Sequence, residues 1–186
     1  MGWSRDLAAG ISLVLMAGAA MAQDLAILER TAQEQYMDGL YGAADESIRA
    51  AITSANPEDF NRLILFQGLI ASRMAGDGGN AADGRALLGM AVGDSQDGSW
   101  PRPVIDYLLG LKELQQVANA IRHAGISSEA KKARLCELSF YAAAFAVNDG
   151  EKRFAVALLD KADETCAEDA TYRALAASER ERLELE

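Results

Sequence analysis

The two cysteines of the chain, Cys136 and Cys166, constrain its fold more than any other residues. They bracket a segment whose apolar pattern predicts two antiparallel helices, 128–147 and 152–165, joined by an Asp-Gly turn. In such a hairpin the start of the first helix lies beside the end of the second, so both thiols are expected at the same end. A disulfide there would close a loop of about 30 residues and stabilise the fold by roughly 3–4 kcal/mol. That bond requires an oxidising compartment.

The opening of the chain predicts a secretory signal peptide over 1–22, which would supply such a compartment. Arg5 gives a short positive region, an apolar run of about 14 residues follows, and Ala20-Met21-Ala22 matches the small-x-small cleavage pattern. The alternative is a membrane anchor, but the apolar run is shorter than the ~20 residues that span a bilayer. We therefore expect cleavage before Gln23 and a periplasmic protein without stable membrane insertion.

The rest of the chain, 23–186, predicts one mostly helical domain. Hydrophobic residues make up 50% of the sequence, Ala and Leu are abundant, and only 3 residues are proline. Alternating runs of β-branched residues, which are typical of strands, are missing. The formal net charge is −10, and the Lys and Arg residues do not cluster on one face. Because proteins bind nucleic acid by neutralising its phosphates with such a face, we expect no nucleic-acid partner.

Helical segments recur in pairs along this domain. Gly39, Asn56-Pro57 and the glycine-rich stretch 76–80 separate successive segments. Pairs of helices that repeat roughly every 35 to 45 residues are typical of helical-hairpin arrays, so the predicted fold is all-α, a short solenoid of stacked antiparallel hairpins. The apolar periodicity predicts helices over 23–37, 43–54, 60–74, 81–92, 104–109, 111–123, 128–147, 152–165 and 169–185.

Small residues at regular places in these hairpins resemble the tetratricopeptide repeat. The segment Tyr41–Ala51 resembles the second helix of a repeat, and Gly68 stands at the small position of a first helix. In the last hairpin Ala142-Ala143 occupies that small position. The positions that supply the second-helix pattern there are Ala155, Leu159 and Ala162.

Longer stretches are similar to envelope-associated tetratricopeptide proteins of Gram-negative bacteria, which include adaptor lipoproteins. These stretches are Trp100–Gly110, Cys136–Tyr141 and Ala155–Cys166, and the resemblance extends over roughly 24–180. The lipid-attachment cysteine of such lipoproteins is missing here, so the resemblance does not imply outer-membrane anchoring.

The resemblance implies a non-catalytic scaffold that binds a protein or peptide partner in a concave groove lined by the first helices. Arg62 and Arg73 stand about three helical turns apart, so they share a face and would favour a carboxylate. Solvated surface arginines are the alternative. The candidate groove residues are Tyr36, Arg62, Leu69, Arg73, Phe140, Ala144 and Asn148.

Other functions stay open from the sequence. The chain could be a permanent accessory subunit of a larger periplasmic complex, or an enzyme whose site is spread over several helices. The pattern favours no particular oligomeric state.

Patterns of catalytic and metal-binding residues are missing. His123 is the only histidine, and its place near a helix end favours a contact with the helix dipole over a catalytic or ligand role. One histidine and a cysteine pair cannot form a zinc site. The stretch 77–80 resembles a calcium loop but lacks its closing glutamate. We therefore expect no cofactor, and we expect Trp100 to be a packing residue rather than a ligand platform.

Overall fold

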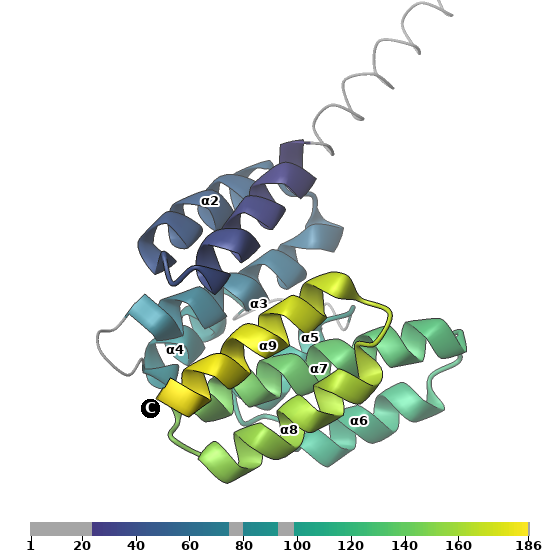
Figure 1. Ribbon diagram of the computed structural model, residues 1–186. Coiled ribbons are helices and arrows are strands. Elements are labelled where there is room, and N and C mark those ends of the chain that lie inside the picture. The colour runs from purple at the N-terminus through teal and green to yellow at the C-terminus, as the bar shows by residue number, and fades with distance from the viewer. Residues whose placement is uncertain (1–23, 75–79, 93–98, 186) are drawn as a thin grey trace, which may run out of the picture.

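A computed structural model describes residues 24–74, 80–92 and 99–185 (Figure 1). Every regular element in these ranges is an α-helix, which confirms the predicted all-α class. The predicted signal peptide, 1–22, lies outside the described residues. The helices are 24–37, α2 (Tyr41–Ser54), α3 (Pro57–Met74), α4 (Ala81–Val92), α5 (Arg102–Leu108), α6 (Leu114–His123), α7 (Ser128–Asn148), α8 (Lys152–Thr165) and α9 (Ala170–Leu185).

The helix α3 begins at Pro57, earlier than the predicted residue 60. The Asn56 side chain accepts hydrogen bonds from the backbone N–H groups of Glu58 (2.9 Å) and Asp59 (3.0 Å). Proline in the first helical turn loses no helical hydrogen bond. Asn56-Pro57 therefore separates α2 from α3, as predicted, and also initiates α3, because a capping side chain serves the helix that follows it.

Antiparallel helical hairpins organise the chain (Figure 1). Helix 24–37 pairs with α2, α3 with α4, and α7 with α8. The shorter α5 and α6 are inserted between the second and third hairpins and pack on α7. Gly39 and Gly150 stand at the turns of the first and third hairpins with φ near +76° and +73°. Glycine adopts this left-handed conformation without steric cost, so both turns can be tight.

Two glycines let the helices α3 and α4 pack closely in their hairpin. A Cβ atom on Gly84 would overlap the backbone oxygen of Gly68, and one on Gly68 would lie 2.8 Å from the side chain of Leu88. The two helix backbones therefore touch directly, as the small residue predicted at position 68 requires.

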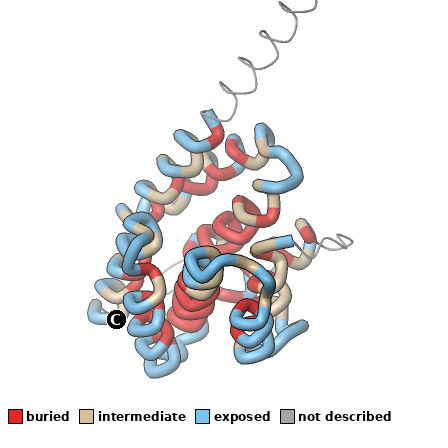
Figure 2. The backbone as a smooth tube through the Cα atoms, turned by 90° about the vertical axis from the view of Figure 1, so that its right-hand side faces the viewer, coloured by how far each residue is buried: buried red, intermediate tan, exposed pale blue. Residues whose placement is uncertain are grey.

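The core follows the central helices. Helices α3 and α7 carry long runs of buried residues, and Figure 2 shows buried positions facing the interior while exposed ones face outward. Helix α9 packs against both α7 and α8, so it is not part of a simple pair. Its Leu175 and Ala176 are buried together with Glu179. A buried glutamate in such a place requires polar partners.

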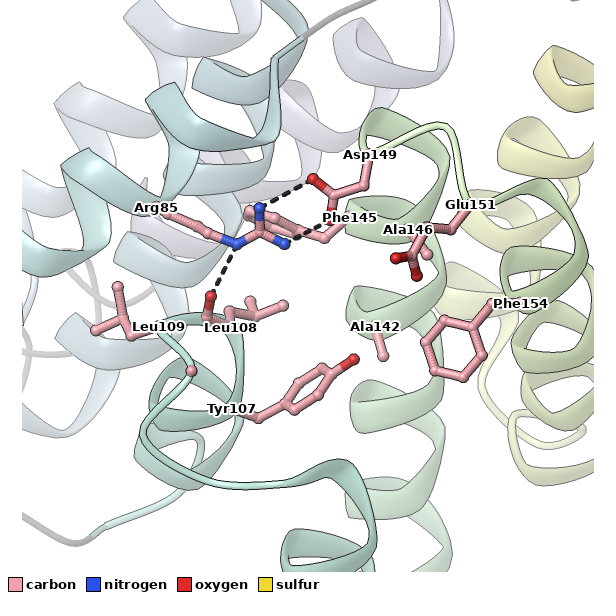
Figure 3. Close-up of a pocket in the computed structure, with 11 residues that line it drawn as sticks. Arg85, Tyr107, Leu108, Leu109, Ala142, Phe145, Ala146, Asp149, Glu151 and Phe154 are labelled. Atoms are coloured by element: carbon pink, nitrogen blue, oxygen red, sulfur yellow. Dashed lines mark hydrogen bonds and ion pairs between the residues drawn. The ribbon is translucent and has the colours of Figure 1, made fainter.

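Arg85 joins α4 to the ends of α5 and α7 (Figure 3). Its Nη1 and Nη2 donate to the two carboxylate oxygens of Asp149, at 2.9 and 2.6 Å, and its Nε donates to the backbone oxygen of Leu108 at 2.9 Å. The guanidinium carbon also lies 5.6 Å from the centroid of the Phe145 ring. Because this bidentate pairing fixes the orientation of the guanidinium, Arg85 is part of the framework rather than a free surface charge.

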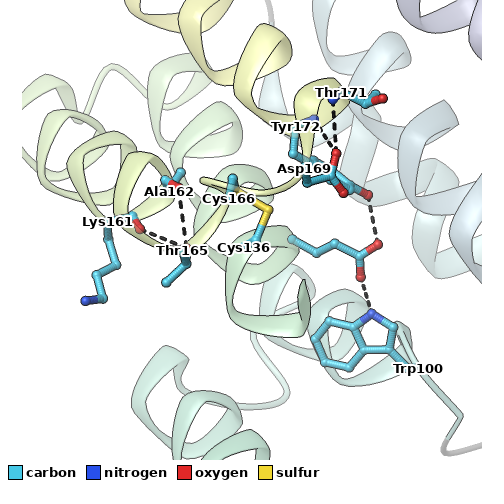
Figure 4. The surroundings of a disulfide bond; sticks show 10 residues. Trp100, Cys136, Lys161, Ala162, Thr165, Cys166, Asp169, Thr171 and Tyr172 are labelled. Carbon is cyan, nitrogen blue, oxygen red and sulfur yellow. Dashed lines mark hydrogen bonds between the residues drawn. A yellow bond between two sulfur atoms is a disulfide. The ribbon is translucent and has the colours of Figure 1, made fainter. Parts of the chain in front are cut away.

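The cysteine pair forms the predicted link (Figure 4). Cys136 in α7 and Cys166 after α8 are joined by a disulfide, with Cα atoms 4.9 Å apart, inside the ~4.4–6.8 Å range of such bonds. Both residues are buried. The predicted hairpin and its pairing of thiols at one end are confirmed.

Candidate functional site

Two of the predicted groove residues, Tyr36 and Arg73, lie in a buried ionic cluster. Glu179 of α9 accepts a hydrogen bond from the Tyr36 hydroxyl and pairs with the Arg73 guanidinium. Arg182 pairs with the same carboxylate, donates to the backbone oxygen of Tyr36 at 2.8 Å, and lies 4.7 Å from the centroid of that ring. Burial, and then the negative charge of Glu179, raises the pKa of the Tyr36 hydroxyl.

Arg73 was predicted to bind a carboxylate of a partner, but the carboxylate that it binds belongs to Glu179 of the same chain. Arg73 is only 7% exposed and Tyr36 is 0% exposed, because α9 and its Glu179 cover them. The structure places both residues beneath α9 and not on an open groove. Arg73 and Arg62 do share a face, as predicted, since both contact helix 24–37, through Tyr36 and Glu29 respectively.

Four more of the predicted groove residues are buried or partly buried. Leu69, Phe140 and Ala144 are fully buried, and the Phe140 ring packs against Tyr172 of α9 with centroids 5.5 Å apart. Asn148 is partly buried and donates from Nδ2 to the Ser72 hydroxyl. Inward-facing positions of first helices become core positions wherever another helix covers them. The sequence pattern does not distinguish an inward-facing position that lines an open groove from one that another helix covers.

Arg62 borders an open part of this surface. A cavity of about 290 Å³ lies between helix 24–37, α3, α7 and the start of α9, and Arg62 is one of its lining residues. Its guanidinium pairs with Glu29 of the first helix and, at 2.9 Å, with Asp59 one turn earlier in α3. Because carboxylates on both sides already neutralise Arg62, it does not present the free positive charge that the sequence suggested.

Glu137 lines the same cavity, although no pattern in the sequence marks it as a site residue. Its carboxylate accepts hydrogen bonds from the Trp100 indole N–H and, at 2.9 Å, from the Tyr172 hydroxyl. Burial raises the pKa of Glu137, while these hydrogen bonds oppose the rise. The three side chains tie the start of α5 to α7 and α9. Trp100 thus has the structural role expected of it. Glu137 is partly buried, and its hydrogen bonds to Trp100 and Tyr172 join segments distant in the chain, so the sequence carries no signal for it.

The raised pKa of Glu137 gives a prediction about pH. A carboxyl group whose folded pKa exceeds its unfolded value contributes stability that is fully present below the unfolded pKa and is lost as the pH rises through the folded pKa. The loss therefore begins near the ordinary value of 4.5 and extends upward. Relative to Glu137→Gln, which does not titrate, the wild type should become progressively less stable from pH 4 to pH 7. Urea unfolding of both proteins across this range measures the difference. A difference that is constant or has the opposite slope would contradict the prediction.

The described ranges contain no candidate metal site and no candidate membrane-spanning helix. Within them, no group of three or more His, Cys, Asp or Glu side chains could hold a metal ion. None of their helices combines the length and apolarity needed to cross a bilayer. His123 is exposed in the last turn of α6, where its Nδ1 contacts the backbone oxygen of Asn119 at 2.8 Å. Residues 77–79 of the calcium-like stretch lie outside the described residues.

Comparisons with known proteins assign no family. No family model matches the chain, and neither the curated proteins nor the solved structures contain a match. The resemblance to tetratricopeptide proteins therefore rests on the sequence pattern and stays a prediction.

Proposed function

We propose that this protein is an exported, non-catalytic scaffold or adaptor of tetratricopeptide type, which binds a protein or peptide partner in the groove beside Arg62. The observation that carries the proposal is the cavity of about 290 Å³ left open by helix 24–37, α3, α7 and α9. Cavities between helices are common binding sites. The disulfide supports export, since such bonds persist in oxidising compartments, and the periplasm is the proposed location.

The lining of this cavity suits a polar partner segment. Arg30 lines it, is exposed, and forms no ion pair within the described part of the chain. Gln33 and Thr171 supply hydrogen-bonding groups on facing helices. A partner carboxylate can pair with Arg30 in a charge-assisted hydrogen bond. Arg30, rather than Arg62 or Arg73, would then be the arginine that binds a carboxylate of the partner.

Site-specific crosslinking tests this proposal. A photoreactive phenylalanine analogue at Gln33 of the mature chain, irradiated in an extract of the organism that encodes it, should give discrete crosslinked partners. The same analogue at Ala120, an exposed position on α6, should give none of these species. Arg30→Glu should weaken partner capture roughly tenfold, the effect of losing ~1.5 kcal/mol from a charged hydrogen bond.

Arg153→Glu provides the matched control for that reversal. Arg153 is exposed on α8 and does not line the cavity, so its reversal changes the net charge equally without changing the groove. Equal crosslinking at Gln33 and Ala120, or capture that is insensitive to Arg30→Glu, would argue against binding in this groove.

A further inference from the structure

A second cavity, of about 390 Å³, lies between α4, the end of α5 and the turn that joins α7 to α8 (Figure 3). None of its lining residues lines the groove cavity beside Arg62. Its volume is near the lower end of the ~300–1,000 Å³ range of ligand pockets, which suits one long side chain or a small ligand.

One wall of this cavity is electrically balanced. Arg85 and Asp149 lie along it and neutralise each other through their bidentate pair. The Arg85 guanidinium covers the ring of Phe145, so that ring is not available to a ligand. Because this wall carries no net charge, the rest of the lining decides which ligand the cavity favours.

The rest of the lining combines a carboxylate with aromatic side chains. Glu151 is exposed and forms no ion pair within the described residues, and the Phe154 ring on α8 is 40% exposed. The Tyr107 side chain extends into the same space, and its hydroxyl makes no hydrogen bond within the described part of the chain (Figure 3). Burial, and then the negative charge of Glu151, raises the pKa of this hydroxyl, so the two groups are electrostatically coupled.

We infer that this cavity binds a lysine or arginine side chain of a protein partner, held by Glu151, Tyr107 and Phe154. The cation pairs with the Glu151 carboxylate, the Tyr107 oxygen accepts one of its hydrogen bonds, and the Phe154 ring adds a cation–π contact. The net charge of −10 on the whole chain attracts a basic segment toward this surface. The second site lets an adaptor contact a basic segment independently of the groove beside Arg62.

Nuclear magnetic resonance titration of the isotopically labelled mature chain tests this inference. The probes are blocked pentapeptides of alanine with a central lysine, arginine, glutamate or norleucine. The lysine and arginine peptides should shift the amide signals of Gly110, Ala146 and Phe154 in a saturable manner, with a dissociation constant on the order of 1 mM. The glutamate and norleucine peptides should not. Glu151→Gln and Phe154→Ala should each weaken binding about two- to fivefold.

Matched variants control for general effects of charge and surface apolarity. Glu181→Gln removes an exposed carboxylate of α9, and Val156→Ala trims an exposed apolar side chain of α8, and neither residue lines the cavity. Both should leave the titration unchanged. Equal shifts from the glutamate or norleucine peptide, or full binding by Glu151→Gln, would overturn the inference. Tighter binding of free 1,5-diaminopentane than of the lysine peptide would also overturn it, because the ligand would then be a small cation rather than a protein side chain.

Discussion

Replacing Glu179 by alanine should lower the free energy of unfolding by about 3–5 kcal/mol, the usual cost of removing one partner from a buried ion pair. Glu179 is 0% exposed and binds Arg73, Arg182 and the Tyr36 hydroxyl. Without its carboxylate, the guanidinium of Arg73 stays buried and loses its neutralising charge. The midpoint of urea unfolding, followed by circular dichroism, measures the loss.

A double substitution distinguishes the charge effect from lost packing. Glu179→Leu combined with Arg73→Met removes both charges of the Arg73–Glu179 pair and keeps similar volumes, so it should destabilise less than Glu179→Leu alone. Glu181→Ala on the exposed face of α9 should change stability by no more than about 0.5 kcal/mol. If Glu179→Ala is as mild as Glu181→Ala, the ionic cluster does not hold α9 in place.

Removing the disulfide should have an effect of similar size. Cys136→Ser combined with Cys166→Ser should lower the free energy of unfolding by about 3–4 kcal/mol, because the unfolded chain regains the entropy of an open loop. The two cysteines are 30 residues apart in sequence and belong to one hairpin. Because the rest of the core does not depend on the bond, the double variant should keep its helical content. Thermal unfolding in the far ultraviolet measures both properties.

A reductant serves as the control for these serine substitutions. It should lower the unfolding temperature of the wild type toward that of the double variant and leave the variant unchanged. The wild type is first unfolded and refolded with the reductant, so that the disulfide is reduced. If its unfolding temperature is then unchanged, the disulfide contributes no stability.

The position of α9 explains why the groove predicted from sequence differs from the observed one. Arg62 and Arg73 were expected to bind a carboxylate of a partner, and for Arg73 that chemistry occurs with Glu179 instead. The partner is a segment 106 residues farther along the same chain. Periodicity identifies α9 as an amphipathic helix but carries no information about the surface on which it packs. Tyr36 and Phe140 are buried for the same reason.

The sequence by itself determined the helices, their hairpin pairing and the disulfide. These depend on contacts between neighbours in sequence: apolar periodicity, the cap at Asn56, the tight turn at Gly150 and the short span between Cys136 and Cys166. Only the tertiary structure decided that Glu179, among 28 acidic residues, neutralises Arg73, and that Glu151 faces Tyr107 across a cavity. Both pairings join helices distant in the chain. Since many carboxylates are chemically equivalent in a sequence, packing alone selects those that are buried and those that stay open to a ligand.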